Sequence, residues 1–142
     1  MKYPSWKIAV ACIVVFTIMS PQNAAAAITM KIDNINQKLC IAKHHTRNYM
    51  KGIAKHYAYN KLKDLGWSEY EWKSLLTLWT RESRWDYKAD NPKSTAYGIA
   101  QILDYPKNTS VKKQVDDGIK YIVHRYSKPS LALKHHLRVG WY

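Results

Sequence analysis

The sequence predicts a small all-α domain. Apolar residues recur at helical spacing in several separate stretches, and residues that typically start or end helices flank these stretches. No stretch alternates apolar and polar residues for long enough to indicate a strand. The length of 142 residues suits a single domain of this kind.

The N-terminal segment has the layout of a secretory signal peptide. Two lysines form a positive start, residues 8–19 are mostly apolar, and Pro21 ends the run. Ala24–Ala27 offers a small-residue cleavage site. The apolar run is shorter than the roughly 20 residues that span a bilayer. We therefore expect residues 1–27 to be a signal peptide on an exported, periplasmic or secreted protein without stable membrane insertion; the alternative is an uncleaved anchor.

Cysteine usage and charge limit the function classes. Cleavage would remove Cys12 and leave Cys40 alone, so no internal disulfide is expected. Cys40 is then a buried small hydrophobe, the reading we favour, or a free thiol. The net charge of +13 attracts polyanions, but the basic residues form no compact cluster that would read a nucleic acid. Outside the cytoplasm the polyanions are wall and membrane surfaces; the alternative is a basic surface without a specific partner.

The N-terminal half of the predicted mature chain contains one clear helix. Residues 28–47 are polar and mixed, and we expect a weakly ordered segment there. Good helix formers follow over 48–65, with Asn48 as a plausible N-cap. Gly66 ends this helix.

The sequence predicts further helices after Gly66. Ser68 and Glu71 have the spacing of a capping box and predict a helix over 69–83. A long loop rich in small polar residues follows. The remaining expected elements are a short helical turn over 99–103, a helix over 111–126, and a last short helix over 130–137 that begins next to Pro129.

Glu82 is the residue that indicates chemistry. It shares a helix face with apolar residues such as Leu75 and Trp79 and lies at the carboxyl end of that helix. Both desolvation and the helix dipole disfavour its ionised form, so its pKa should rise. A general acid needs such a carboxyl near neutral pH. The alternative is a structural glutamate paired with a neighbouring arginine.

The amino-acid sequence around Glu82 resembles that of a known protein family. Glu82-Ser83 ends an apolar helix, and Tyr97-Gly98-Ile99-Ala100-Gln101 follows a polar loop. This ordered pattern is similar to the lysozyme-like soluble lytic transglycosylases. Segments near residues 118–126 and 140–142 resemble a sub-branch found in phage tail and prophage proteins. The resemblance covers about residues 48–142, which would form the lysozyme-like transglycosylase domain.

The resemblance implies roles for the matched residues. Glu82 would be the acid/base, and Ser83 would hold its carboxyl or contact an acetamido group. Gly98 would let the backbone approach a sugar, and Gln101 would bind substrate or orient Glu82. Tyr97 and Tyr121 would line the groove. Apart from the resemblance, we also expect Trp85 near the groove, because tryptophan suits stacking on sugars. Many family members carry an Ala-Tyr-Asn-x-Gly segment that this chain lacks, and Tyr121 is the expected substitute for its tyrosine.

The resemblance also implies the reaction and its partner. The substrate would be the MurNAc-GlcNAc β-1,4 bond of peptidoglycan glycan strands, cleaved to a 1,6-anhydro product with no metal and no cofactor. Ordinary glycosidases use two carboxyls. Asp86 and Asp90 lie in the loop after Glu82 and could approach it as a second carboxyl, but aspartate favours turns, and we prefer the interpretation of both as loop residues. The histidines lack metal-ligand spacing.

Three other interpretations stay open from the sequence. The first is a hydrolysing lysozyme on the same fold. The second is a non-catalytic wall-binding module, and the third is a basic membrane-active or nucleic-acid-binding protein. An enzyme of this type would suit wall turnover, a secretion or conjugation apparatus, or a phage.

Overall fold

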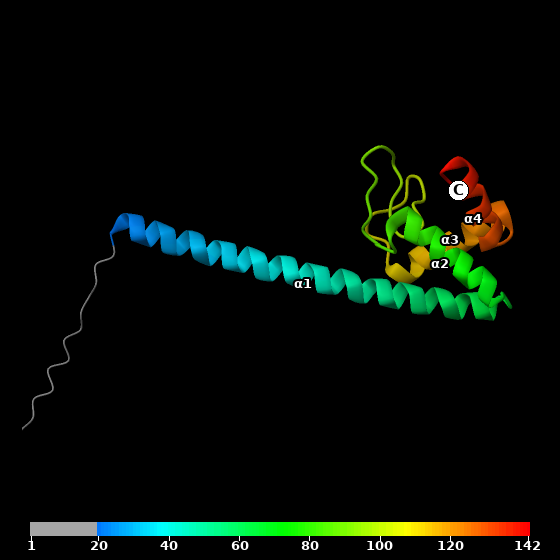
Figure 1. The fold of residues 1–142 in the computed structure, drawn as a ribbon, viewed down its shortest axis with the longest axis horizontal. Coiled ribbons are helices and arrows are strands. Elements are labelled where there is room, and N and C mark those ends of the chain that lie inside the picture. The colour runs from blue at the N-terminus through cyan, green and yellow to red at the C-terminus, as the bar shows by residue number, and fades with distance from the viewer. Residues whose placement is uncertain (1–19) are drawn as a thin grey trace, which may run out of the picture. The chain divides into compact units, whose positions relative to one another are not determined.

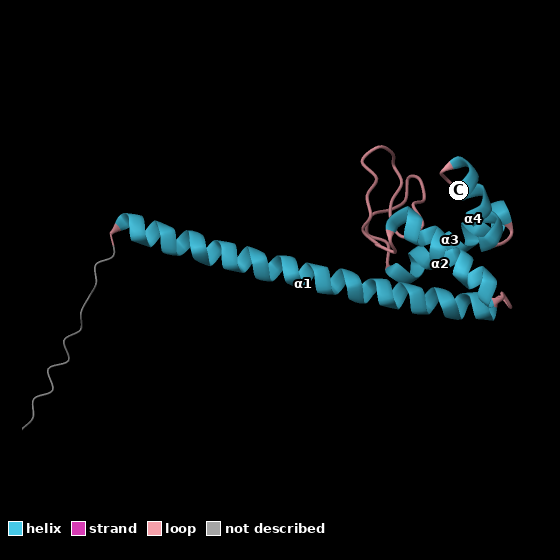
Figure 2. Ribbon diagram, in the orientation of Figure 1, coloured by secondary structure: helices cyan, strands magenta, loops and turns pink. Residues whose placement is uncertain are grey.

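The computed structural model describes residues 20–142 and contains four α-helices and no strand in that range (Figures 1 and 2). The all-α expectation is confirmed. The expected signal peptide lies outside the described residues up to residue 19. The helices are α1 (Pro21–Asp64), α2 (Glu69–Ser83), α3 (Val111–Tyr126) and α4 (Pro129–Val139).

Helix α1 is longer than the sequence analysis predicts. Residues 28–47 are helical instead of weakly ordered, and Asn48 lies inside the helix instead of at its N-cap. The physical reason is that no glycine or proline interrupts the chain between Pro21 and Gly52, and the early turns are rich in alanine. Gly66, at φ +70°, follows the helix end as expected.

The chain divides into two compact units, residues 1–39 and residues 40–142. In the first unit, residues 20–39 are described, and large apolar side chains such as Ile28, Ile35 and Leu39 are more than half exposed. Cys40, at the start of the second unit, is exposed with a free thiol, so the expectation of a buried cysteine is wrong. No helix within residues 20–142 is both long and apolar enough to cross a membrane.

The second unit contains the hydrophobic core. The end of α1 contributes small side chains, Ala54 and Ala58, which allow close packing. Helix α2 contacts α4, and α3 also contacts α4. Trp79 of α2 and Trp85 after it are the largest fully buried side chains. Further core residues are Leu62, Leu75, Leu78, Ile99, Val115, Ile119, Ile122 and Ala132.

The predicted helices over 69–83 and 111–126 are confirmed, but the capping box is wrong. Ser68 is the N-cap of α2 without a side-chain hydrogen bond. The Glu71 carboxylate is buried and instead accepts hydrogen bonds from the Ser130 backbone N–H and hydroxyl, both at 2.8 Å. Because α2 packs against α4, this carboxylate can satisfy the first turn of α4 and complement its dipole.

A loop over residues 84–110 connects α2 to α3. Residues 99–103 form a turn, where the sequence predicted a helical turn. Isolated β-bridges join Asp90 to Tyr97 and Tyr97 to Ile102. Arg84 and Trp85 both adopt positive φ, at 54° and 62°, directly after α2. The buried indole of Trp85, which donates to the Leu76 carbonyl at 3.2 Å, holds the chain in this reversal.

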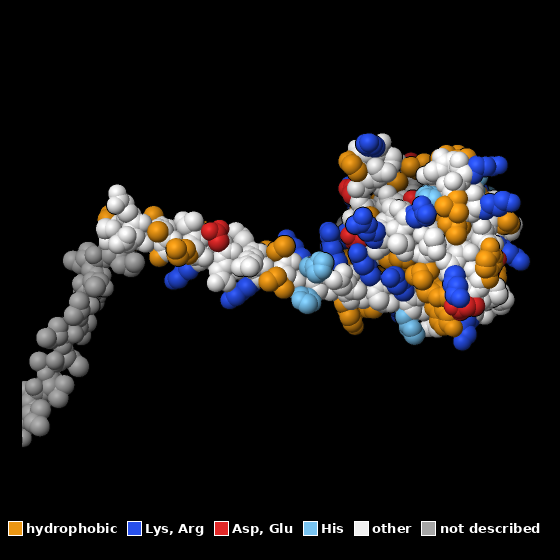
Figure 3. Space-filling model, viewed as in Figure 1, with side chains coloured by type: hydrophobic (Ala, Val, Ile, Leu, Met, Phe, Trp, Pro, Cys, Tyr) orange, Lys and Arg blue, Asp and Glu red, His pale blue; other side chains and the backbone are white. Residues whose placement is uncertain are grey.

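The basic residues are scattered over the surface of the second unit. In the face that Figure 3 shows, lysine and arginine side chains alternate there with apolar and neutral ones.

Candidate functional site

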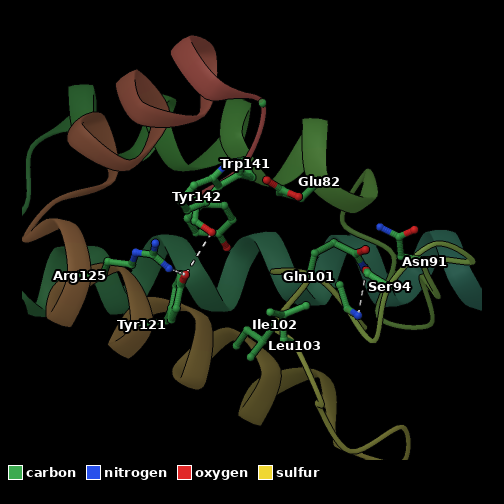
Figure 4. A pocket seen from close by; sticks show the side chains of 12 residues that line it. Glu82, Asn91, Ser94, Gln101, Ile102, Leu103, Tyr121, Arg125, Trp141 and Tyr142 are labelled. Atoms are coloured by element: carbon green, nitrogen blue, oxygen red, sulfur yellow. Dashed lines mark hydrogen bonds between the residues drawn. The ribbon is translucent and has the colours of Figure 1, made fainter.

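A cavity of about 600 Å³ opens in the second unit, beside the end of α2 (Figure 4). Its walls come from α2, the 84–110 loop, α3 and the residues that follow α4. This volume lies in the usual range for small-molecule and sugar sites. The lining residues are Glu82, Asn91, Ser94, Ala96, Gln101, Ile102, Leu103, Tyr121, Arg125, Gly140, Trp141 and Tyr142.

Glu82 is the only acidic side chain among these lining residues. It lies in the last turn of α2, and its side chain is 15% exposed. Burial raises its pKa from the ordinary 4.5 to about 7. The predicted direction of the pKa shift is therefore found, with desolvation as its cause. A large fraction of Glu82 is then protonated at neutral pH.

His136 of α4 touches this carboxyl. Its Nδ1 lies 2.9 Å from Oε1 of Glu82, and its side chain is 12% exposed. Such a contact would favour the charged pair, yet burial opposes charge on both groups. Burial lowers the pKa of His136, and the nearby Arg81 and His135 lower it further. Because both pKa values move against ionisation, we take the neutral pair as the main state below the Glu82 pKa of about 7.

Tyr142 connects the cavity wall to the core. Its hydroxyl accepts from the Trp79 indole N–H at 2.9 Å and donates to the Ala100 carbonyl at 2.9 Å. Burial, followed by the charge of Glu82, raises the pKa of Tyr142 well above its ordinary value. Tyr142 therefore stays a neutral phenol beside Glu82.

Two expected substrate-binding residues are engaged elsewhere. The Ser83 hydroxyl donates to the Ile99 carbonyl at 2.7 Å, which fastens the end of α2 to the loop. Trp85 is 1% exposed, and its ring packs 5.0 Å from that of Trp79. The expectation that Trp85 lines the groove is therefore wrong, because the reversal after α2 turns its indole into the core.

Gly98 and Tyr97 also serve the loop. Gly98 has φ +81°, and a Cβ there would lie 2.4 Å from Oε1 of Gln114. That glutamine oxygen accepts from the Ile99 N–H at 3.0 Å. The positive φ and the Gln114 side chain are sufficient by themselves to require glycine at this position. Tyr97 is buried in the two β-bridges and is absent from the cavity lining.

Gln101 and Tyr121, two of the expected substrate-binding residues, line the cavity. The Gln101 side-chain nitrogen donates to the Gly98 carbonyl at 2.9 Å and to the Ala89 carbonyl at 3.2 Å, so its side-chain oxygen is the group left for a ligand. The Tyr121 hydroxyl donates to the Tyr142 carbonyl at 3.1 Å and accepts from Arg125 at 2.6 Å. These bonds direct the Tyr121 hydroxyl to the chain end.

The two aspartates after Glu82 pair with basic residues outside the cavity. Asp86 lies 3.5 Å from Arg47, and Asp90 lies 2.6 Å from Lys107. Neither lines the cavity. Their interpretation as loop residues agrees with these positions, and no second carboxylate side chain in the described chain shares the cavity with Glu82.

Sequence reasoning missed several residues of the site. His136 reaches the site only through the packing of α4, and no local pattern marks it. Trp141 and Tyr142 belong to the 140–142 segment of the resemblance, which by itself assigned neither of them a place in the cavity wall. Asn91 and Ser94 lie in a loop whose sequence is typical of polar turns, so nothing in it indicates a binding site. Comparison with family models, with curated proteins and with solved structures finds no match for this chain. The chemistry of the cavity is therefore the basis for assigning a function.

Proposed function

We propose that this chain is a peptidoglycan lytic transglycosylase, with a lysozyme-like helical domain and Glu82 as its single acid/base. The observation that carries the proposal is a buried carboxyl, with a pKa raised to about 7, in the wall of a cavity of about 600 Å³. A general acid that works near neutral pH needs such a pKa. The Glu82-Ser83 and Tyr97–Gln101 patterns support the same assignment through their resemblance to the family.

Among the residues that the structure describes, no second carboxylate side chain lines the cavity, and this favours a transglycosylase over a two-carboxyl hydrolase. Glu82 would donate its proton to the glycosidic oxygen as the bond from that oxygen to C1 of the MurNAc unit breaks. The C6 hydroxyl of the same sugar would then attack C1 and return its proton to Glu82. The product is a 1,6-anhydro sugar, and no water is consumed.

Other lining residues suit a glycan. Trp141 is 51% exposed and offers a flat apolar face of the kind that stacks on sugar rings. Gln101 and Asn91 bring side-chain amides to the lining, and Arg125 brings a cation for the carboxylates of the peptide stems. The signal-like N-terminus supports a site of action outside the cytoplasm, in wall turnover, a secretion or conjugation apparatus, or a phage.

The test compares Glu82→Gln with wild type on purified peptidoglycan, with mass analysis of the products. Removing the transferable proton should lower the rate by about 10²–10⁴-fold, and wild-type products should carry a 1,6-anhydro end. Glu69→Gln, at an exposed position on the same helix, is the matched control and should keep the wild-type rate. A folded Glu82→Gln protein with full activity would refute the assignment. Reducing ends from wild type would indicate a hydrolysing lysozyme.

A further inference from the structure

The contact between His136 and Glu82 has no role in the mechanism above. His136 does not line the cavity, yet its Nδ1 is 2.9 Å from Oε1 of Glu82, and both side chains are largely buried. The two groups come from different helices, α4 and α2. The packing of α2 against α4 therefore sets this distance.

The Nδ1 atom is buried but makes no hydrogen bond within the described chain. Its contact with Oε1 has the distance of an ion pair without the angle of a hydrogen bond. An unsatisfied buried polar atom is costly, and in native proteins it calls for an explanation. Here Nδ1 lies 2.9 Å from an oxygen of a carboxyl that we assign to proton transfer.

The surroundings keep the pair neutral at rest. Burial opposes the charge on each group, and it raises the pKa of Glu82 and lowers that of His136. The charges of Arg81 on α2 and His135 on α4 lower the pKa of His136 further. Tyr126 of α3 and the buried Tyr142 also lie within electrostatic reach of Glu82, and neither brings a positive charge.

We propose that His136 is a positioning residue whose Nδ1–H turns onto Oε1 of Glu82 when that carboxyl gives up its proton, leaving Oε2 for the substrate. This inference rests on the proposed glycan cleavage. A rotation of the ring suffices, because the two atoms are already 2.9 Å apart. The donor gains its acceptor only as negative charge develops, so the interaction is stronger during the reaction than before it. His136 keeps its proton throughout.

The protonation of Glu82 can be measured without substrate. The chain has three glutamates, Glu69, Glu71 and Glu82, so ¹³C labelling of glutamate gives three side-chain carboxyl signals to titrate by NMR in the full chain. His136→Asn places an amide near the position of Nδ1, whereas His136→Gln places it near Nε2. We expect the Glu82 midpoint in the Asn variant to stay near that of wild type, and the midpoint in the Gln variant to rise.

Activity provides the second readout. The Gln variant should lose about tenfold or more in kcat while the Asn variant keeps most of it, because an amide near Nε2 does not reach the carboxylate. Equal Glu82 midpoints in wild type and in both folded variants would overturn the proposal. Thermal unfolding checks that each variant is folded.

The wild-type protein alone also tests the proposal. ¹⁵N NMR of the imidazole rings reports which nitrogen of neutral His136 carries the proton. We expect Nδ1–H above the Glu82 midpoint, and an Nε2–H tautomer there would overturn the proposal. If the tautomer and midpoints agree but wild type releases no 1,6-anhydro product, the pair stands and the proposed function fails.

Discussion

Replacing Glu82 by glutamine should change how the folding stability depends on pH. Burial raises the pKa of Glu82 from 4.5 to about 7 in the folded state. Below pH 4.5 the carboxyl is protonated in both states and has no effect. Between pH 4.5 and about 7 the unfolded chain releases this proton more readily, so stability falls as pH rises through that window and levels off above it.

The magnitude follows from the same shift. A rise from 4.5 to about 7 corresponds to at most about 3 kcal/mol of stability lost above pH 7. The carboxyl is 15% exposed, and the solvent that reaches it reduces this value. Glu82→Gln lacks the titration, so it should equal wild type at about pH 4 and exceed it by roughly 1–3 kcal/mol at about pH 8.

Chemical denaturation of both proteins at the two pH values measures this difference directly. Glu69→Gln is the control, because it makes the same chemical change at an exposed position of the same helix. If the stability difference between Glu82→Gln and wild type is the same at both pH values, the carboxyl is not desolvated in the folded protein. Glu82 would then be ionised at neutral pH and unsuited to act as a general acid there.

Two further predictions concern stability. Gly98→Ala should cost about 1–3 kcal/mol, because its φ is positive and a Cβ would meet a buried side chain; Gly52→Ala, where a Cβ meets nothing, should raise stability by up to about 1 kcal/mol. Thermal unfolding that ranked these two variants the other way would contradict the turn assignment. Glu71→Gln should cost about 1–3 kcal/mol because it weakens two buried hydrogen bonds at the start of α4; a melting temperature equal to that of Glu69→Gln would exclude this role.

Local sequence patterns predicted the elements that local forces determine. The helices over 69–83 and 111–126 begin after serine caps and present apolar stripes, and both appear with the predicted bounds. The prediction for residues 28–47 is wrong because it gives their polar composition more weight than the absence of helix-breaking residues. An amphipathic pattern detects a helix that packs, so it misses one whose side chains stay exposed.

The candidate site was predictable only in part. The position of Glu82 follows from helix geometry, because an acid on an apolar face at a helix end can be found from spacing alone. The sequence could not show that Glu71 satisfies α4, or that Trp85 turns into the core after a reversal at positive φ. Both depend on contacts between segments that are distant in the chain. For the same reason His136 carries no local signal, and the resemblance over residues 140–142 does not by itself place Tyr142 in the cavity wall.

The double hydrogen bond of the Tyr142 hydroxyl has a consequence for the thermodynamics of binding. The phenol joins the Trp79 indole of the core to the Ala100 carbonyl of the loop, so this wall of the cavity is set before any ligand arrives. Opening the wall would break both bonds and hydrate a buried ring. A ligand therefore orders little of the protein when it enters, and it loses less affinity to conformational entropy than it would on a flexible surface. Substitutions that remove the hydrogen bonds of the Tyr142 hydroxyl should weaken ligand binding more than they slow the chemical step.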